Sequence, residues 1–199
     1  MTDKSPDADR RKLLTTVAAA VGGFGAGAVT VPFVQSLGPS AKAKALGGDV
    51  EVDIADLKPG ELRIVEWRGM AVYVLHRTPE MLRDIQTLED RLRDAASEIT
   101  SQQPEYARNR YRSIRPEILV VMGVCTHLGC APSFKPEHGF KKAGPWWLGG
   151  FYCPCHDSIY DLSGRVFEGT SPAPRNLPVP PHHYVSESKI VIGDQSQHT

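Results

Sequence analysis

The sequence has no excess of either charge, since its 23 lysines and arginines balance its 23 aspartates and glutamates. A nucleic-acid-binding protein needs a basic face, so this balance gives no support to that class of function. The sequence also lacks any visible internal repeat. Its 199 residues are enough for one modest domain plus an appendage.

Charged side chains are absent from Leu13 to Ala41. The apolar part, residues 13–37, is about 25 residues long and exceeds the roughly 20 that a helix needs to cross a bilayer. The basic run Arg10-Arg11-Lys12 precedes it and favours an N-terminus in the cytoplasm. We therefore expect a single-pass anchor in the cell inner membrane, with the rest of the chain in the periplasm.

The basic run is also part of a candidate export signal. The segment Asp9–Leu14 resembles a twin-arginine signal, whose pathway carries proteins already folded. An ordinary cleaved signal peptide is the alternative, because Ala41-Lys42-Ala43 resembles a small-residue cleavage site. The length of the apolar run favours a retained anchor.

Changes in composition divide the chain into four segments. The stretch after the apolar run has no apolar periodicity and contains two adjacent glycines, which is typical of a flexible linker. We expect a cytoplasmic N-terminus at 1–12, a transmembrane anchor at 13–38, a tether at 39–49 and a folded domain at 50–199.

The folded domain reads as mostly antiparallel β-structure with one helix. The run Val50–Ile54 alternates apolar and acidic residues, which predicts a strand. Two further apolar runs flank Arg68-Gly69 and predict a hairpin. Thr78 and Pro79 are typical of the N-cap and first position of a helix. The other expected elements are hairpin strands at 62–67 and 70–76, a helix ending near Ala96, a strand at 118–124 and a closing strand at 185–192.

No cysteine occurs outside residues 125–155, which sets the four cysteines apart from scattered structural ones. Two short loops carry them, Cys125–Cys130 and Cys153–Ser158. Each loop offers two thiols and one imidazole, and each contains a glycine or proline that lets the backbone wrap closely around a metal. The pattern indicates a metal site.

Four thiols and two imidazoles are too many for one tetrahedral metal, which leaves two arrangements open. In one, a zinc ion takes four of the six groups. In the other, one Cys and one His from each loop bind a two-iron cluster, and Cys130 and Cys155 form a disulfide between the loops. The Cys-x-His and Cys-x-x-His spacings favour the second arrangement, because zinc sites more often use Cys-x-x-Cys or His-x-x-x-His pairs.

The two loops resemble those of the Rieske iron–sulfur subunit of cytochrome bc1 complexes, of the proteobacterial type. The resemblance extends to Glu66–Gly69, Arg115–Leu119, Tyr160–Val166 and Pro172–Pro180, and so covers nearly the whole chain. It implies an all-β fold, a Rieske-type antiparallel β-sandwich with one helix. A cluster-binding subdomain would lie at about 120–175, and one N-terminal transmembrane helix would precede the domain.

The resemblance also implies one Rieske-type [2Fe–2S] cluster per subunit. Its ligands would be two thiolates and two imidazoles, those of Cys125, Cys153, His127 and His156. The remaining cysteines, Cys130 and Cys155, would be joined as the disulfide. Replacing two thiolates by neutral imidazoles removes negative charge and raises the reduction potential of such a cluster.

Four further residues have roles implied by the resemblance. The hydroxyls of Ser158 and Tyr160 resemble hydrogen-bond donors to a bridging sulfide and to the Cys125 sulfur, and losing either should lower the potential. Leu128 would contact cytochrome b, and Pro172 belongs to a proline loop that covers the cluster.

The implied function is that of the iron–sulfur subunit of ubiquinol–cytochrome c reductase, a redox enzyme. With His156 and His127 as its catalytic residues, it would transfer one electron, coupled to a proton, from ubiquinol to cytochrome c1 by swinging on its tether. The implied partners are cytochrome b, cytochrome c1, ubiquinol and the membrane, within a dimeric complex. Two alternatives are the Rieske subunit of an arsenite-oxidase-like enzyme and a membrane-anchored structural zinc protein.

Asp157 departs from the pattern, because the family normally has glycine directly after the second ligand histidine. Glycine at that place suggests a left-handed or crowded backbone, and Asp is among the least costly other residues there. The substitution also puts a carboxylate beside the cluster, which should lower its reduction potential.

Overall fold

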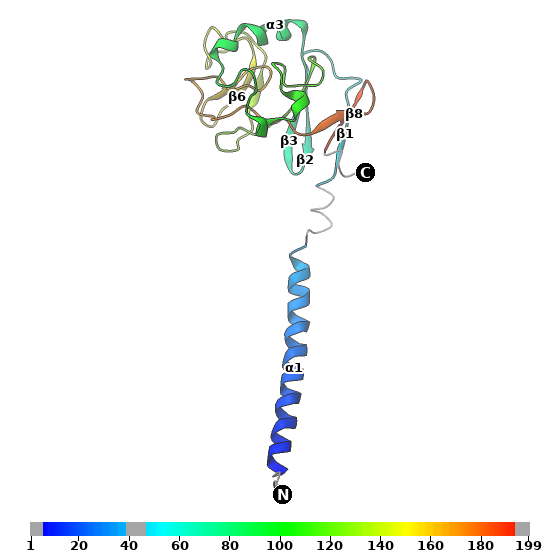
Figure 1. Cartoon of the computed structure of the whole chain (residues 1–199). Coiled ribbons are helices and arrows are strands. Elements are labelled where there is room, and N and C mark those ends of the chain that lie inside the picture. The colour runs from blue at the N-terminus through cyan, green and yellow to red at the C-terminus, as the bar shows by residue number, and fades with distance from the viewer. Residues whose placement is uncertain (1–5, 39–46, 194–199) are drawn as a thin grey trace. The chain divides into compact units, whose positions relative to one another are not determined.

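The structure is a computed structural model and describes residues 6–38 and 47–193 (Figure 1). It divides into two compact units, Met1–Ala45 and Leu46–Thr199. In its described part the first unit is a single helix, whereas most of the regular secondary structure of the second is antiparallel sheet.

Helix α1 spans Pro6–Ser36, and by length and composition it could cross a membrane. Its side chains from Asp7 onward are exposed. A helix suits a hydrocarbon environment because its backbone groups are bonded within the segment. Residues 13–36 of the anchor expected at 13–38 lie in this helix and residues 37–38 follow it, while residues 39–46 of the expected tether lie outside the described residues.

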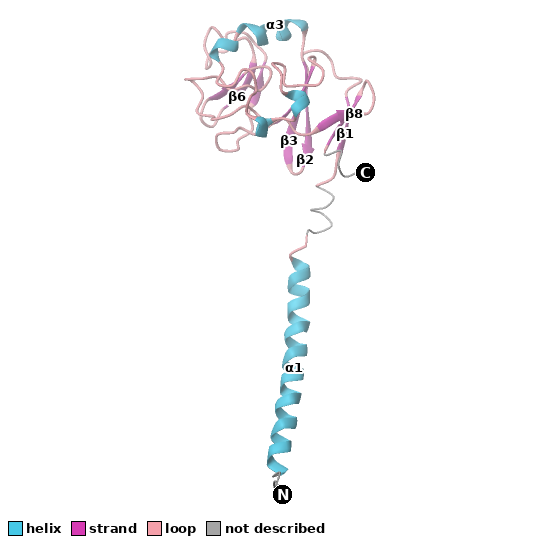
Figure 2. Cartoon of the chain, viewed as in Figure 1, coloured by secondary structure: helices cyan, strands magenta, loops and turns pink. Residues whose placement is uncertain are grey.

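The described part of the second unit contains three antiparallel sheets of three strands each (Figure 2). Their strand orders are β1-β9-β8, β2-β3-β4 and β5-β6-β7. The strands are β1 Val50–Asp53, β2 Leu62–Trp67, β3 Met70–His76, β4 Ile118–Met122, β5 Ser133–Lys135, β6 Gly150–Cys153, β7 Ser158–Tyr160, β8 His182–Tyr184 and β9 Lys189–Ile192. The expected all-β class is confirmed.

The sheet β2-β3-β4 is central because both of its faces are covered. Along β3, Tyr73 and Leu75 belong to one hydrophobic cluster, whereas Val72 and Val74 belong to another. Strand β4 alternates in the same way. Burial on both faces explains why Ile118–Met122 is apolar throughout instead of alternating with polar residues.

The hairpin expected around Arg68-Gly69 is confirmed. Trp67 pairs with Met70, so the turn has two residues. Arg68 and Gly69 both have positive φ, 52° and 74°. Two such residues are what a type I′ turn requires, and this turn matches the twist of the strands.

Helix α3 spans Pro79–Thr87 and begins as expected, since the Thr78 hydroxyl accepts a hydrogen bond from the Met81 amide at 3.2 Å. The expected end near Ala96 is wrong. The backbone becomes extended at Leu92, which forms a β-bridge with Phe167 instead of a further helical turn. Short 3-10 turns follow α3 at η1 Glu89–Arg91, η2 Thr100–Gln102 and η3 Glu105–Ala107.

Two expected strands, at 118–124 and 185–192, have different bounds in the structure. The closing strand expected at 185–192 is a hairpin of β8 and β9, in which the Val185 amide donates to the Lys189 carbonyl at 3.0 Å. The strand expected at 118–124 ends at Met122. Gly123 then lies so close to the Tyr73 ring that a Cβ atom would overlap it.

Three arginines, Arg77, Arg112 and Arg165, are almost completely buried. Arg165 forms an ion pair with Asp161 at 2.8 Å. Arg77 and Arg112 donate to backbone carbonyls of residues 162–164, among other acceptors. Burial lowers the pKa of Arg77 to about 9 and that of Arg112 to about 10. The three guanidinium groups therefore fasten the segment that follows β7 to the rest of the unit.

Gly150 lets β6 and β7 meet closely at the start of β6. Its φ is +149°, and a Cβ atom there would overlap the Tyr160 carbonyl oxygen. Strand β6 leads into Cys153, so the same close approach sets the position of the second loop.

We expect Gly150→Ala to lower the free energy of unfolding by about 3 kcal/mol, because the new methyl group forces β6 away from β7. Thermal unfolding of the full chain in detergent, followed by far-UV circular dichroism, measures this loss. Gly139→Ala is the matched control: Gly139 also has a positive φ, 66°, but no atom lies within 4 Å of an added Cβ. It should cost only about 1 kcal/mol. Equal losses for the two variants would contradict this account.

Candidate metal centre

The first loop, between β4 and β5, is a tight turn that brings its two cysteines together. The Cys125 amide donates to the Cys130 carbonyl at 2.8 Å, and the Gly129 amide donates to the Cys125 carbonyl at 3.0 Å. Gly129 has a φ of +85°, a left-handed conformation that glycine adopts without strain. His127 and Leu128 lie at the tip of this turn.

The second loop is the turn of the β6–β7 hairpin, closed by the pair Cys153 and Ser158. Its four residues 154–157 are exposed, whereas Cys153 and Ser158 are buried. Asp157 has a φ of +59°, so the left-handed backbone expected at this position is confirmed. The hairpin thus presents His156 on the surface above a buried thiol.

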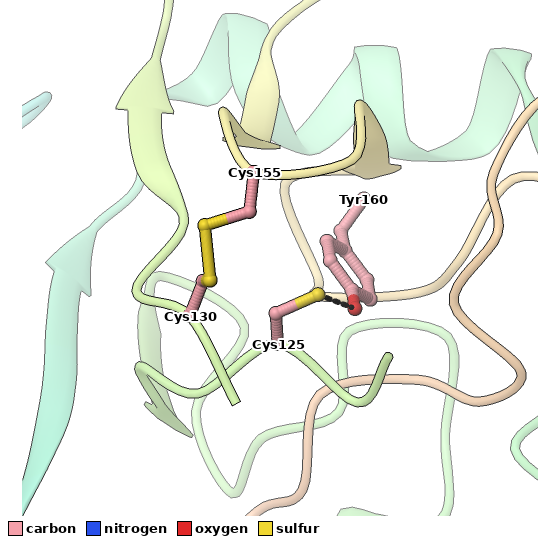
Figure 3. The surroundings of a disulfide bond; sticks show 4 residues. All are labelled: Cys125, Cys130, Cys155 and Tyr160. Carbon is pink, nitrogen blue, oxygen red and sulfur yellow. Dashed lines mark hydrogen bonds between the residues drawn. A yellow bond between two sulfur atoms is a disulfide. The ribbon is translucent and has the colours of Figure 1, made fainter. Parts of the chain in front are cut away.

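A disulfide joins Cys130 of the first loop to Cys155 of the second, as expected (Figure 3). The remaining cysteines, Cys125 and Cys153, are free and buried. The sulfur of Cys153 lies within 4.8 Å of both disulfide sulfurs. Two of the four sulfurs are therefore unavailable as thiolate ligands, and one free thiol remains on each loop.

The two free thiols influence each other's ionisation. Burial raises the pKa of Cys125, but the hydrogen bond with the Tyr160 hydroxyl, together with the nearby His127 amide and Ser158 hydroxyl, brings it below its usual value on balance. Burial and the neighbouring Cys125 sulfur both raise the pKa of Cys153. The site therefore stabilises one thiolate and disfavours a second, unless a cation shares the two sulfurs.

Tyr160 connects β7 to the first loop. Its hydroxyl forms a hydrogen bond with the Cys125 sulfur (Figure 3), with the two atoms 3.2 Å apart, and accepts a hydrogen bond from the Thr126 amide at 3.1 Å. Burial raises the pKa of Tyr160 above its usual value, so the phenol keeps its proton. Sequence reasoning missed Thr126, whose only signal was its place between Cys125 and His127.

The two histidines lie side by side, with ring centroids 4.8 Å apart and ring planes at 87°. The Nδ1 atom of His127 is buried, yet it has no hydrogen-bond partner among the described residues. The buried hydroxyl oxygen of Ser158 likewise has none. Unpaired buried polar atoms are costly, which indicates that a bound group completes their interactions. Two thiols, two imidazoles and a hydroxyl fit a metal cluster with sulfur in its core.

Leu128 and Pro172 are both exposed beside these loops, Leu128 to 69% of its full area. The segment that contains Pro172 is fixed at both ends: the Ser171 hydroxyl accepts from the Ile159 amide at 3.2 Å, and the Arg175 carbonyl accepts from the Thr126 hydroxyl at 2.6 Å. The segment therefore contacts both β7 and the first loop.

Comparison with known proteins identifies the family. The model of the "Rieske [2Fe-2S] domain" family matches residues 51–181. The chain belongs to the Rieske family. The model described as "Ubiquitinol-cytochrome C reductase Fe-S subunit TAT signal" matches residues 1–40. The family resemblance drawn from the two loops is thereby confirmed, as is the expected [2Fe–2S] cofactor.

Two bacterial relatives of this chain carry the same name. An Allochromatium vinosum protein named "Ubiquinol-cytochrome c reductase iron-sulfur subunit" is 50% identical, over 93% of this chain and 88% of the relative. A protein of the same name from Blastochloris viridis is 38% identical, over 94% of each. A chain of the solved structure titled "Hyperthermophilic respiratory Complex III" is 26% identical, with a TM-score of 0.48 over 90% of this chain and 98% of that chain.

The disulfide closes a loop with a sequence separation of 25 residues. We expect Cys130→Ser to lower the free energy of unfolding by about 3 kcal/mol, because the unfolded chain gains freedom when this loop opens. The shift in the midpoint of thermal unfolding of the full chain measures the loss. The Cys130→Ser/Cys155→Ser double variant should lose no more than either single variant, since all three lack the same bond. If the double variant lost nearly the sum of the free energies lost by the two single variants, the two cysteines would act separately, which contradicts this account.

Proposed function

We propose that this chain is the iron–sulfur subunit of a ubiquinol–cytochrome c reductase and that four residues of its two loops hold the [2Fe–2S] cluster. The ligands are Cys125, Cys153, His127 and His156. The observation that carries this assignment is the pair of loops, which together present two buried free thiols and two adjacent imidazoles. Because Nδ1 of His127 is buried and has no partner among the described residues, it is the ring nitrogen that would bind the cluster.

When bound, the cluster accepts one electron at a potential raised by its two neutral imidazole ligands. The Tyr160 hydroxyl, 3.2 Å from the Cys125 sulfur, donates to that sulfur and stabilises the added negative charge. The Ser158 hydroxyl is buried and free to donate into the site. Loss of either hydroxyl therefore lowers the potential.

The exposed tip of the two loops is the surface that meets ubiquinol and cytochrome b. His156 is exposed, and with the cluster bound, its imidazole would offer one ring nitrogen at the surface to accept the hydroxyl proton of ubiquinol. His127 lies beside it and keeps the second imidazole at the same surface. The exposed Leu128 side chain supplies apolar contact with cytochrome b, and Pro172 shields the cluster on another side.

The proposed function divides the chain into four segments. They are a cytoplasmic N-terminus at 1–12, an anchor at 13–38, a tether at 39–49 and the Rieske domain at 50–199, with the cluster loops within about 120–175. The twin-arginine family match and the apolar helix α1 support an inner-membrane anchor with the domain in the periplasm. The domain moves on its tether between cytochrome b and cytochrome c1 within a dimeric complex.

The two alternative functions considered from the sequence are not favoured. The relatives are named as ubiquinol–cytochrome c reductase subunits, which does not favour an arsenite-oxidase-like enzyme. The disulfide removes two thiols from any zinc site, and the family match is to a [2Fe–2S] domain.

Purification of the tagged full chain from detergent-solubilised membranes tests the function. We expect b-type and c-type haem to copurify and the preparation to reduce cytochrome c with ubiquinol. His156→Ala should abolish this activity, because the cluster loses a ligand at the quinol surface. His138→Gln is the control, since His138 is exposed outside both loops and pairs with Asp84. Absence of haem, or full activity of His156→Ala, would contradict the proposal.

A further inference from the structure

Asp157, the residue that departs from the family pattern, is held by a hydrogen bond. Its side chain projects from the exposed turn next to His156. Its Oδ1 atom accepts a hydrogen bond from the Tyr152 hydroxyl, and Tyr152 itself is only 4% exposed. The carboxylate is therefore tied to strand β6 by a buried side chain and cannot rotate freely beside the ligand histidine.

The same tyrosine links the carboxylate to a cation. Tyr152 has a single hydroxyl proton, which it gives to Asp157, and its oxygen accepts a hydrogen bond from Lys142 Nζ at 3.0 Å. Lys142 Nζ also lies 5.2 Å from the centroid of the Tyr152 ring. The three groups form one directed chain, from ammonium to phenol to carboxylate, in which each donor strengthens the next.

Lys142 belongs to the long segment between the two loops, and contacts within this segment and with strand β6 hold it in place. The Gly144 amide donates to the Phe140 carbonyl at 2.9 Å, which folds the segment around Lys142. The Phe140 ring meets the Tyr152 ring with centroids 5.2 Å apart. The hydrogen bond to Tyr152 raises the pKa of Lys142, so the ammonium remains charged at neutral pH.

A carboxylate beside the cluster opposes its reduction, because one electron taken from ubiquinol adds a negative charge at the same place. We propose that Tyr152 and Lys142 are positioning residues that fix the Asp157 carboxylate and offset its charge, so that the cluster keeps a high reduction potential despite the loss of the family glycine. This inference rests on the proposed function and assigns a role to residues outside the ligand set.

Redox titration of the full complex in native membranes, at one fixed pH and followed by electron paramagnetic resonance, tests the proposal. Lys142→Met should lower the ratio of reduced to oxidised cluster at a fixed applied potential by about threefold, equivalent to about 28 mV for a one-electron couple. Tyr152→Phe, which keeps the ring, should act in the same direction. Lys141→Met is the matched control, since Lys141 is exposed and has no hydrogen bond or ion pair among the described residues.

The decisive comparison repeats these substitutions in an Asp157→Gly background. There the effects of Lys142→Met and Tyr152→Phe should shrink to that of Lys141→Met, because no carboxylate remains to be held. Equal shifts with and without Asp157, or equal shifts for Lys141 and Lys142, would overturn the proposal. If the complex with Lys142→Met failed to assemble, the comparison of Tyr152→Phe in the unmodified chain with Tyr152→Phe in the Asp157→Gly background would decide. A Rieske signal missing from the unmodified chain would refute the proposed function instead.

Discussion

The bond between Cys130 and Cys155 holds together the loop that connects β4 to β5 and the turn of the β6–β7 hairpin, and the site depends on this link. Neither loop alone offers more than one free thiol and one imidazole. With the loops joined, the free thiols of Cys125 and Cys153 lie in one buried place and the two imidazoles lie side by side. The Tyr160 hydroxyl adds a second link from β7 to Cys125. A small loop-rich site is thereby made rigid without a large core of its own.

The base of the second loop is fixed by buried charge. Asp161 follows Tyr160 directly, and its carboxylate accepts from Arg165, while Arg77 and Arg112 donate to nearby carbonyls. Guanidinium groups are costly to bury unless their donors are used, and here most of them are. The hydrogen bonds that satisfy the arginines therefore also fix the direction in which Tyr160 enters the site. The segment that follows β7 therefore stabilises the fold and positions a side chain of the site.

The sequence alone predicted those features that depend on local chemistry or on spacing. The hairpin at Arg68-Gly69 follows from turn preference, and the disulfide is implied by the spacing of the two loops and their resemblance to the Rieske family. The end of α3 could not be predicted, because Leu92 continues the helical spacing of apolar residues but pairs with Phe167, 75 positions further on. The hydrogen bond from Tyr152 to Asp157 and the burial of the arginines also arise only from tertiary packing.

The central claim is that the two loops hold a high-potential [2Fe–2S] cluster. Its most direct test is the electron paramagnetic resonance spectrum of the full chain in membranes after reduction with ascorbate, together with assays of iron and labile sulfide. The account predicts iron, sulfide and a rhombic Rieske signal under this mild reductant. Zinc without any signal would contradict the cluster itself. A signal that required dithionite would contradict the high potential and, with it, the oxidation of quinol.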